Sequence, residues 1–368
     1  MSDKLYKIGL THGDFNGIGY ELMLKVLSDE RMWELFEPVI YGSKRLLDHY
    51  LNLLDLNLPK PLKVIGTPEE SEPDTLSLIE VTPDGFGHFD VTPGFPSRES
   101  GELAVYALER ARADVDAGLL DAVVTAPIHK DTAHGVVLSD GMESFPGGHT
   151  EFFAATHPEE TPMMVFADGR GLHVGLMTIH VPLSEVPRLI TREGVINYAR
   201  RLERILKVDF GIPKPRLALL GLNPHAGENG LIGSEEESVI KPAVKDLWDT
   251  GMLCFGPYPS DGFWGSGAWQ KFDGIVALYH DQGLIPFKMM SMTDGVNITA
   301  GLSIVRTSPD HGTAFDIAGK GVADPGSFRA AIYCAIDILR ARRAFAEQTA
   351  DPLQIHPGHK RRESREFE

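Results

Sequence analysis

The sequence predicts an α/β protein built on a largely parallel sheet. Short apolar runs typical of buried strands recur along the chain, and amphipathic stretches with helical spacing separate them. This alternation is typical of folds in which helices connect parallel strands and cover the sheet. The chain has 368 residues, which is long for a single hydrophobic core, so we expect two domains.

The individual elements follow from these patterns in chain order. Near the N-terminus, strands are predicted at 7–11 and 37–43, and each is followed by a helix, at 17–29 and 44–54. The later predicted elements are strands at 121–127, 163–169, 173–179, 216–222 and 274–279 and helices at 191–207 and 327–346. The last helix has an apolar face and should pack on the core.

Histidines follow three of the predicted strands. His180, His225 and His280 each come just after an apolar run. The carboxyl ends of parallel strands meet at one edge of a sheet, where ligands bind. Three neutral imidazoles there suit a divalent cation such as Zn²⁺ and leave positions open for a substrate. One such histidine alone is more often structural, but the repetition favours a metal site, and the wide spacing excludes a compact finger-type site.

Most of the other polar candidates lie between residues 275 and 326. The dipeptide His280-Asp281 ends an apolar run, and Lys288, Asn297 and Arg306 follow at short intervals. A histidine and a carboxylate at a strand end, with cations and an amide close behind, are typical of an α/β active site.

An ordered series of segments resembles the 4-hydroxythreonine-4-phosphate dehydrogenase family over about residues 5–345. These segments are THGDFNGIGYE (11–21), VTAPIHK (124–130), GHTEFFA (148–154), TIHVPL (178–183), LNPHAGENG (222–230), YHDQGLIPFK (279–288), GVNITAGL (295–302) and VRTSPDHGTAFDIAGKG (305–321). The resemblance implies the fold of isocitrate and isopropylmalate dehydrogenases, two α/β domains with a cleft between them. Residues 1–130 and 290–348 would form the nucleotide-binding domain, 131–289 the metal, substrate and dimerisation domain, and 349–368 a charged tail.

The resemblance also assigns roles to individual residues. His180, His225 and His280 would bind the metal, and the substrate would contact His149, Thr150, Lys288, Asn297 and Arg306. No G-x-G-x-x-G fingerprint follows a predicted strand. NAD or NADP would instead bind the segment that resembles an adenosine-binding loop, with contacts from His311, Gly312, Thr313 and Asp316. Asp281 would either position His280 or take part in proton transfer.

The implied activity is an oxidation coupled to a decarboxylation in pyridoxal 5'-phosphate biosynthesis. The enzyme would oxidise the secondary alcohol of 4-phosphooxy-L-threonine and release CO₂ to give 3-amino-2-oxopropyl phosphate. The metal would be Zn²⁺, Co²⁺, Mn²⁺ or Mg²⁺, in an active site at the interface of a homodimer. Three alternatives remain open: a dehydrogenase for 4-phospho-D-erythronate or threonate, a metal-dependent hydrolase, and a non-catalytic binding protein.

Two regions depart from the family pattern. The first motif has four residues where Met, Pro, Ala and Pro are usual, namely His12, Phe15, Asn16 and Tyr20. The loop between His129 and His149 is longer than usual, with His134 and Glu143 among its added or replaced residues. Because loops at strand ends set substrate choice, these departures bear on the substrate rather than on the reaction type.

Composition excludes several other classes of protein. The 52 acidic and 35 basic side chains give a net charge of −17, which argues against nucleic acid as a partner. No segment has the length of a membrane span, and the N-terminus lacks the pattern of a signal peptide. The two cysteines, Cys254 and Cys334, are far apart and lack metal or redox spacing, so we expect reduced thiols and a cytoplasmic location.

Overall fold

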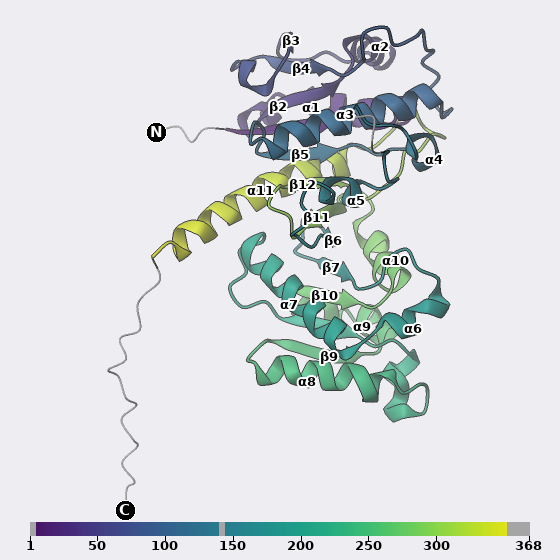
Figure 1. Ribbon diagram of the computed structural model, residues 1–368, viewed down its shortest axis with the longest axis vertical. Helices are drawn as coiled ribbons and strands as arrows, with labels where there is room; N and C mark the ends of the chain where they lie inside the picture. Colours follow the sequence, from purple (N-terminus) through teal and green to yellow (C-terminus); the bar gives the residue numbers. More distant parts are fainter. Residues whose placement is uncertain (1–4, 140–143, 352–368) are drawn as a thin grey trace, which may run out of the picture.

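The strands of the protein form one continuous twelve-stranded sheet, described by a computed structural model for residues 5–139 and 144–351 (Figure 1). Its order is β3-β4-β2-β1-β5-β12-β11-β6-β7-β10-β8-β9. The strands are β1 (Tyr6–Thr11), β2 (Phe36–Gly42), β3 (Leu62–Ile65), β4 (Leu76–Glu80), β5 (Ala122–Thr125), β6 (Met163–Ala167), β7 (His173–Leu176), β8 (Leu217–Leu220), β9 (Cys254–Tyr258), β10 (Gly274–Ala277), β11 (Val296–Ala300) and β12 (Arg306–Pro309). The predicted α/β class and every predicted strand are therefore confirmed.

Two parallel halves of the sheet run in opposite directions. In the first half, the neighbours from β3 to β12 are all parallel. In the second half, β7, β10, β8 and β9 are parallel to one another. The reversal takes place in the middle, where β11 is antiparallel to β12 and β6, and β6 is antiparallel to β7.

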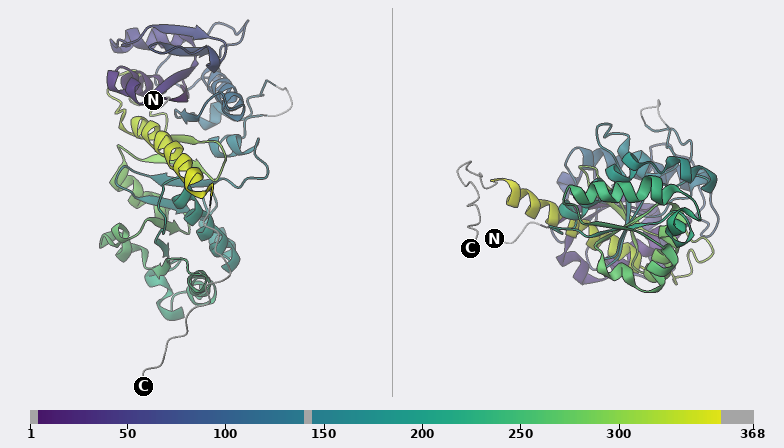
Figure 2. Two further views of the ribbon diagram at one scale, coloured as in Figure 1. Left: turned by 90° about the vertical axis from the view of Figure 1, so that its left-hand side faces the viewer. Right: turned by 90° about the horizontal axis from the view of Figure 1, so that it is seen from below.

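Helices lie on both faces of this sheet (Figure 2). The α-helices are α1 (Gly19–Leu27), α2 (Lys44–Leu54), α3 (Arg98–Asp116), α4 (Lys130–Ala133), α5 (His149–Ala154), α6 (Val186–Leu189), α7 (Arg192–Val208), α8 (Lys241–Asp249), α9 (Ser260–Gly265), α10 (His280–Ser291) and α11 (Gly326–Thr349). The helices predicted from the sequence correspond to α1, α2, α7 and α11. Helix α7 begins after Thr191, whose side chain accepts a hydrogen bond from the backbone of Gly194 and so caps the helix.

The chain crosses between the two halves of the sheet twice. It leaves the first half after β5, enters the second at β6, and returns through β11 to β12. Helix α11, drawn in yellow in Figure 1, then packs against β5, β11 and β12 at the centre.

Of the predicted charged tail, residues from 352 onward lie outside the described part of the chain. No helix among the described residues is long and apolar enough to span a membrane.

A tight turn after β1 depends on Gly13. Its φ of +66° lies in the left-handed region, and a Cβ atom there would overlap the carbonyl oxygen of Pro127. We expect Gly13→Ala to lower the free energy of unfolding by about 2–3 kcal/mol, because backbone strain and steric overlap add. Urea unfolding would measure this. Gly118→Ala is the matched control, since its φ is +72° with open space around it, and should cost about 1 kcal/mol.

Residues that depart from the family pattern pack together in the first half of the molecule. The rings of His12 and Tyr20 stack with centroids 5.1 Å apart, and Tyr20 stacks in turn on Tyr50 at 5.3 Å. Phe15 is fully buried nearby, and its carbonyl accepts a hydrogen bond from the Tyr50 hydroxyl at 2.5 Å. Burial lowers the pKa of His12 to about 4, so this imidazole is neutral at pH 7.

Candidate functional site

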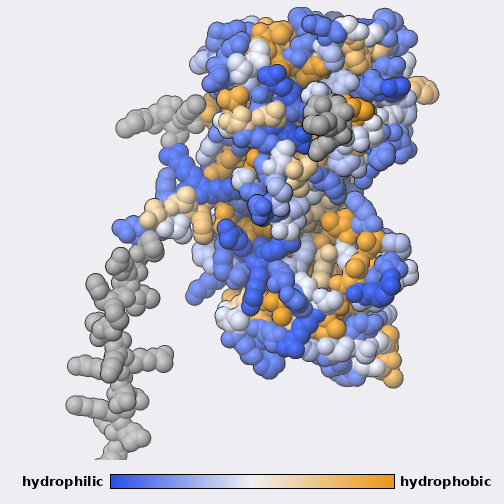
Figure 3. Space-filling model, in the orientation of Figure 1, coloured by the Kyte–Doolittle hydropathy of each residue, from blue (hydrophilic) through white to orange (hydrophobic). Residues whose placement is uncertain are grey.

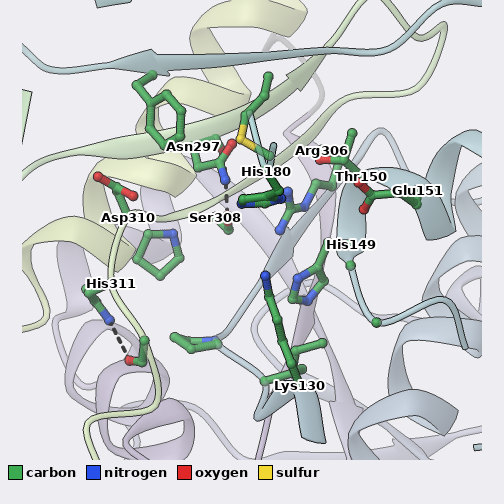
Figure 4. A pocket seen from close by; sticks show the side chains of 18 of the residues that line it. Lys130, His149, Thr150, Glu151, His180, Asn297, Arg306, Ser308, Asp310 and His311 are labelled. Carbon is green, nitrogen blue, oxygen red and sulfur yellow. Dashed lines mark hydrogen bonds between the residues drawn. The ribbon is translucent and has the colours of Figure 1, made fainter. Parts of the chain in front are cut away.

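A cavity of about 670 Å³ lies where the two halves of the sheet meet (Figure 4). Its walls come from the segment after β5, helices α5 and α10, the segment after β7, and the central strands β6, β11 and β12. The predicted site residues that line it are His149, Thr150, His180, His280, Lys288, Asn297, Arg306, His311 and Gly312. Residues more than 150 positions apart in the sequence therefore converge on one cavity, as expected for an active site between two halves of a fold.

Arg306 is the most buried charge in this cavity. It is 2% exposed, and its guanidinium donates hydrogen bonds to Thr125 Oγ1 (2.6 Å and 3.1 Å) and to Thr299 Oγ1 (3.1 Å). Both partners are neutral hydroxyls, and within the described residues no ion pair joins Arg306 to a carboxylate. Burial lowers the pKa of Arg306 to about 9. Because a buried cation without an anionic partner is costly, this arrangement favours an anionic ligand.

Several buried polar atoms of the residues that line the cavity have no hydrogen-bond partner. They are Nε2 of His149, Oδ1 of Asn297 and Nε2 of His311. Burial, and after it the charges of Arg306 and Lys130, hold the pKa of His149 well below its usual value, so its ring is neutral at pH 7. Buried polar groups are nearly always paired, so unpaired ones that line a cavity indicate a polar ligand.

The structure brings two of the three predicted metal ligands together. The ring centroids of His180 and His280 are 5.8 Å apart, because their strands, β7 and β10, are adjacent and parallel. Asp281 Oδ1 lies 2.7 Å from Nδ1 of His280, which leaves Nε2 of that ring available for a metal. Asp281 itself does not line the cavity.

His225 is exposed and does not line the cavity. Within the described ranges, no group of three or more His, Cys, Asp or Glu residues in one chain is placed to hold a metal ion. The fit of a metal to this single chain is therefore limited to His180 and His280, and the three-histidine site stays a prediction.

The backbone around His225 is unusual. All five residues from His225 to Asn229 have φ between +42° and +76°. The fully buried carboxylate of Glu236 accepts hydrogen bonds from the backbone and the side-chain amide of Asn223, at 2.7 Å and 2.9 Å, and so anchors the start of this segment. Left-handed non-glycine residues are strained, and such strain is concentrated at functional sites.

The predicted nucleotide loop divides between the cavity and the N-terminal motif. His311 and Gly312 line the cavity, whereas Thr313 and Asp316 do not. The carbonyl of Thr313 accepts a hydrogen bond of 3.1 Å from the backbone of Ile18. The loop thus lies against the glycine-rich turn after β1. The two segments whose backbone N–H groups could bind an anion are therefore neighbours.

Sequence reasoning missed four charged or titratable residues that line the cavity, Lys130, His134, Glu151 and Asp310. Three of these lie inside segments that resemble the family and could have been named from them. Asp310 contacts the amine of Lys288, with Oδ1 at 3.4 Å, and burial raises its pKa. His134 belongs to the longer loop, and Glu143 of that loop lies outside the described residues.

Comparison with known proteins gives consistent matches along the chain. The family model described as pyridoxal phosphate biosynthetic protein PdxA matches residues 34–335. A 4-hydroxythreonine-4-phosphate dehydrogenase of Bacteroides thetaiotaomicron is 44% identical over 364 residues, covering 99% of this chain and 97% of that protein. One from Prosthecochloris aestuarii is 40% identical, covering 89% and 96%. The crystal structure of the Klebsiella pneumoniae enzyme of that name aligns with a TM-score of 0.74 at 34% identity, covering 92% and 99%.

Proposed function

This chain belongs to the family of the pyridoxal phosphate biosynthetic protein PdxA, and on that premise we propose that it is a 4-hydroxythreonine-4-phosphate dehydrogenase. It oxidises the secondary alcohol of 4-phosphooxy-L-threonine with a nicotinamide cofactor. The resulting β-keto acid loses CO₂ to give 3-amino-2-oxopropyl phosphate. The family also implies a divalent metal ion.

The observation that carries the proposal is buried Arg306 beside unpaired polar atoms in a cavity large enough for a small acid. The substrate has a phosphate and a carboxylate, and both need charge-assisted hydrogen bonds. Arg306 and Lys288 supply the charges, and neutral His149 can donate to an anionic oxygen. Asn297 and Thr150 offer further polar atoms that fix the orientation of the bound acid.

The chemistry proposed here needs two proton transfers that balance each other. Oxidation sends a hydride from the carbinol carbon to the nicotinamide and releases the hydroxyl proton. Decarboxylation breaks the bond to the carboxylate carbon, sends that electron pair toward the new carbonyl, and consumes one proton at the neighbouring carbon. His180, His225 and His280 would hold the divalent ion, which we propose is Zn²⁺, and this ion would supply Lewis acidity at the reacting oxygen.

We further propose that NAD, or NADP, binds along the loop that includes His311, Gly312, Thr313 and Asp316. Its position against the glycine-rich turn supports this, since backbone N–H groups there can approach a pyrophosphate.

The domain division proposed above, with 1–130 and 290–348 in one domain and 131–289 in the other, is supported by the strand order, because the chain crosses the sheet near both boundaries. The free cysteines Cys254 and Cys334 support a cytoplasmic location.

A homodimer with its active site at the interface is supported by exposed apolar side chains near the histidines. On α10, Ile285 and Met289 are 56% and 81% exposed, Met292 just after its end is 65% exposed, and Figure 3 shows hydrophobic surface over this helix. Leu183 and Leu231, close in sequence to His180 and His225, are also exposed. Contiguous exposed apolar surface is typical of protein interfaces. The family resemblance implies that His280 crosses from the partner subunit, but His280 lies beside His180 within one chain. We therefore propose that His225 is the ligand that comes from the partner subunit.

The dimer can be tested by placing a charge on α10. We expect Met289→Lys to shift the protein toward monomer, because a lysine would be desolvated in an apolar interface. Bound metal should fall with the dimer population. Sedimentation velocity and metal analysis across a dilution series measure both. Val64→Lys, at an exposed position on the edge strand β3, is the control. A monomer that keeps full metal content and activity would contradict the proposed interface.

The function itself is tested by following NADH or NADPH formation and CO₂ release together. Three substrates should be compared: 4-phosphooxy-L-threonine, 4-phospho-D-erythronate and 4-phospho-D-threonate. We expect one CO₂ per reduced nucleotide with the first and much slower turnover with the others. Preference for either sugar acid would replace the proposed substrate, and phosphate release without nucleotide reduction would instead indicate a hydrolase.

A further inference from the structure

The cavity contains a third cation, Lys130, to which the function proposed above assigns no role. Lys130 begins α4, just after the carboxyl end of β5, and lines the cavity. Figure 4 shows its amine extending into the cavity toward His149. Across residues 5–139 and 144–351, no hydrogen bond or ion pair joins this amine to another residue, whereas Lys288 contacts Asp310.

The backbone that carries Lys130 is held firmly in place. Helix α4 packs against α3, and the approach is so close that a Cβ on Gly101 would overlap the carbonyl of Thr132. Gly101 is fully buried within α3, a long helix whose N-terminus is capped by Ser97. The direction in which Lys130 leaves the backbone is therefore set by this helix contact.

Electrostatic effects on the histidines locate the cations within the cavity. Burial, then Arg306, then Lys130 lower the pKa of His149, so both cations lie close to this ring. Lys288 instead lies beside Asp310, and its charge contributes to the lowered pKa of His311, after burial. The charge of Lys130 also acts on His180. The cavity therefore has one end with Lys130, Arg306, His149 and His180, and another end with Lys288 and Asp310.

The two ends differ in net charge. Glu151 also lines the cavity, and its charge acts on Arg306. With Glu151 counted, the end with Lys130 and Arg306 keeps a net positive charge, whereas Lys288 is balanced by Asp310. A phosphate monoester carries about −1.5 to −2 at pH 7, and a carboxylate carries only one negative charge.

We propose that Lys130, together with Arg306 and His149, forms the subsite for the phosphate of the substrate and makes the enzyme selective for phosphorylated acids. This inference rests on the proposed function. Arg306 is held by two threonines at the base of the subsite, and His149 offers a neutral Nε2. Lys130 supplies the second positive charge of the subsite, because the residue is exposed and its amine has no other partner in the described chain.

The test uses the metal-loaded, full-length enzyme and Lys130→Met. With 4-phosphooxy-L-threonine, we expect kcat/KM to fall by about 10- to 100-fold, mainly through KM. With phosphate-free 4-hydroxythreonine, kcat/KM should stay the same. Lys130→Arg should retain most of the selectivity. Lys245→Met, which removes an exposed lysine paired with Asp249 on α8, is the control and should change neither value.

Two results would overturn the phosphate assignment. Equal losses with both substrates would mean that Lys130 acts on the reaction itself, and unchanged kinetics with both would mean that it does not contact the phosphate. Calorimetric binding of inorganic phosphate to the wild type and to Lys130→Met is a separate measurement, and we expect about a tenfold weaker affinity in the variant. If none of the acids reduces the nucleotide, the proposed function fails, while the phosphate titration still decides the role of Lys130.

Discussion

Replacing Arg306 with methionine should lower kcat/KM for the phosphorylated substrate by about two to three orders of magnitude. The guanidinium is buried and fixed by Thr125 and Thr299, so no other residue can bring its charge to the same place. Stability should respond differently from activity. In the ligand-free enzyme the charge is desolvated without an anionic partner, so its removal should leave the free energy of unfolding unchanged or slightly higher. Steady-state kinetics and urea unfolding together measure this pair of effects.

Arg342 provides the matched control for Arg306. It lies on α11 outside the cavity, and its guanidinium bonds to the buried carboxylate of Asp209 at 2.7 Å and to the carbonyls of Leu302 and Ser303. Arg342→Met leaves Asp209 without its partner, so we expect a loss of about 2–3 kcal/mol in stability and little change in KM. A large stability loss in Arg306→Met would mean that Arg306, like Arg342, mainly stabilises the fold. It would then no longer support a role for Arg306 in binding a ligand.

Composition explains only part of which strands the sequence patterns found and missed, since β4 was missed although it reads Leu-Ser-Leu-Ile-Glu. β5, β8 and β10 are continuous apolar runs buried on both faces, and such runs are recognisable without any structural context. β12 is fully buried as well, but it reads Arg-Thr-Ser-Pro and has no apolar signal. Its polar residues are there because this strand forms part of the cavity, with Arg306 facing the substrate space. In β12, the residues that the site requires therefore replace the apolar pattern by which a buried strand is recognised.

The candidate site was predictable only in part, for a related reason. Strand-end histidines could be placed at one edge from the sequence, and in the structure His180 and His280 follow the adjacent strands β7 and β10. The neutral partners of Arg306 could not be found, because Thr125 is 181 positions away in sequence. The left-handed segment at His225 was also inaccessible, since it depends on contacts with buried Glu236 rather than on local residue preferences.

Replacing His12 with methionine, the usual family residue, should remove one defined part of the sensitivity of this fold to acid. His12 is fully buried, and its folded pKa of about 4 lies below the 6.5 of the unfolded chain. As the pH falls below 6.5, the unfolded chain binds a proton that the folded chain does not, so stability decreases until about pH 4 and then levels off. This shift corresponds to about 3 kcal/mol for the single residue.

The two curves of stability against pH should therefore separate as the solution becomes acidic. At pH 7, loss of the stacking on Tyr20 should cost the variant about 1 kcal/mol. At pH 4.5, the variant should instead be the more stable protein by about 1–2 kcal/mol, because it has no imidazole to protonate on unfolding. Other buried histidines, such as His149 and His173, titrate in both proteins and cancel in the difference. Urea unfolding between pH 7 and 4.5 measures the crossing, with exposed His88→Met as the control, and parallel curves would show that His12 is not held neutral by burial.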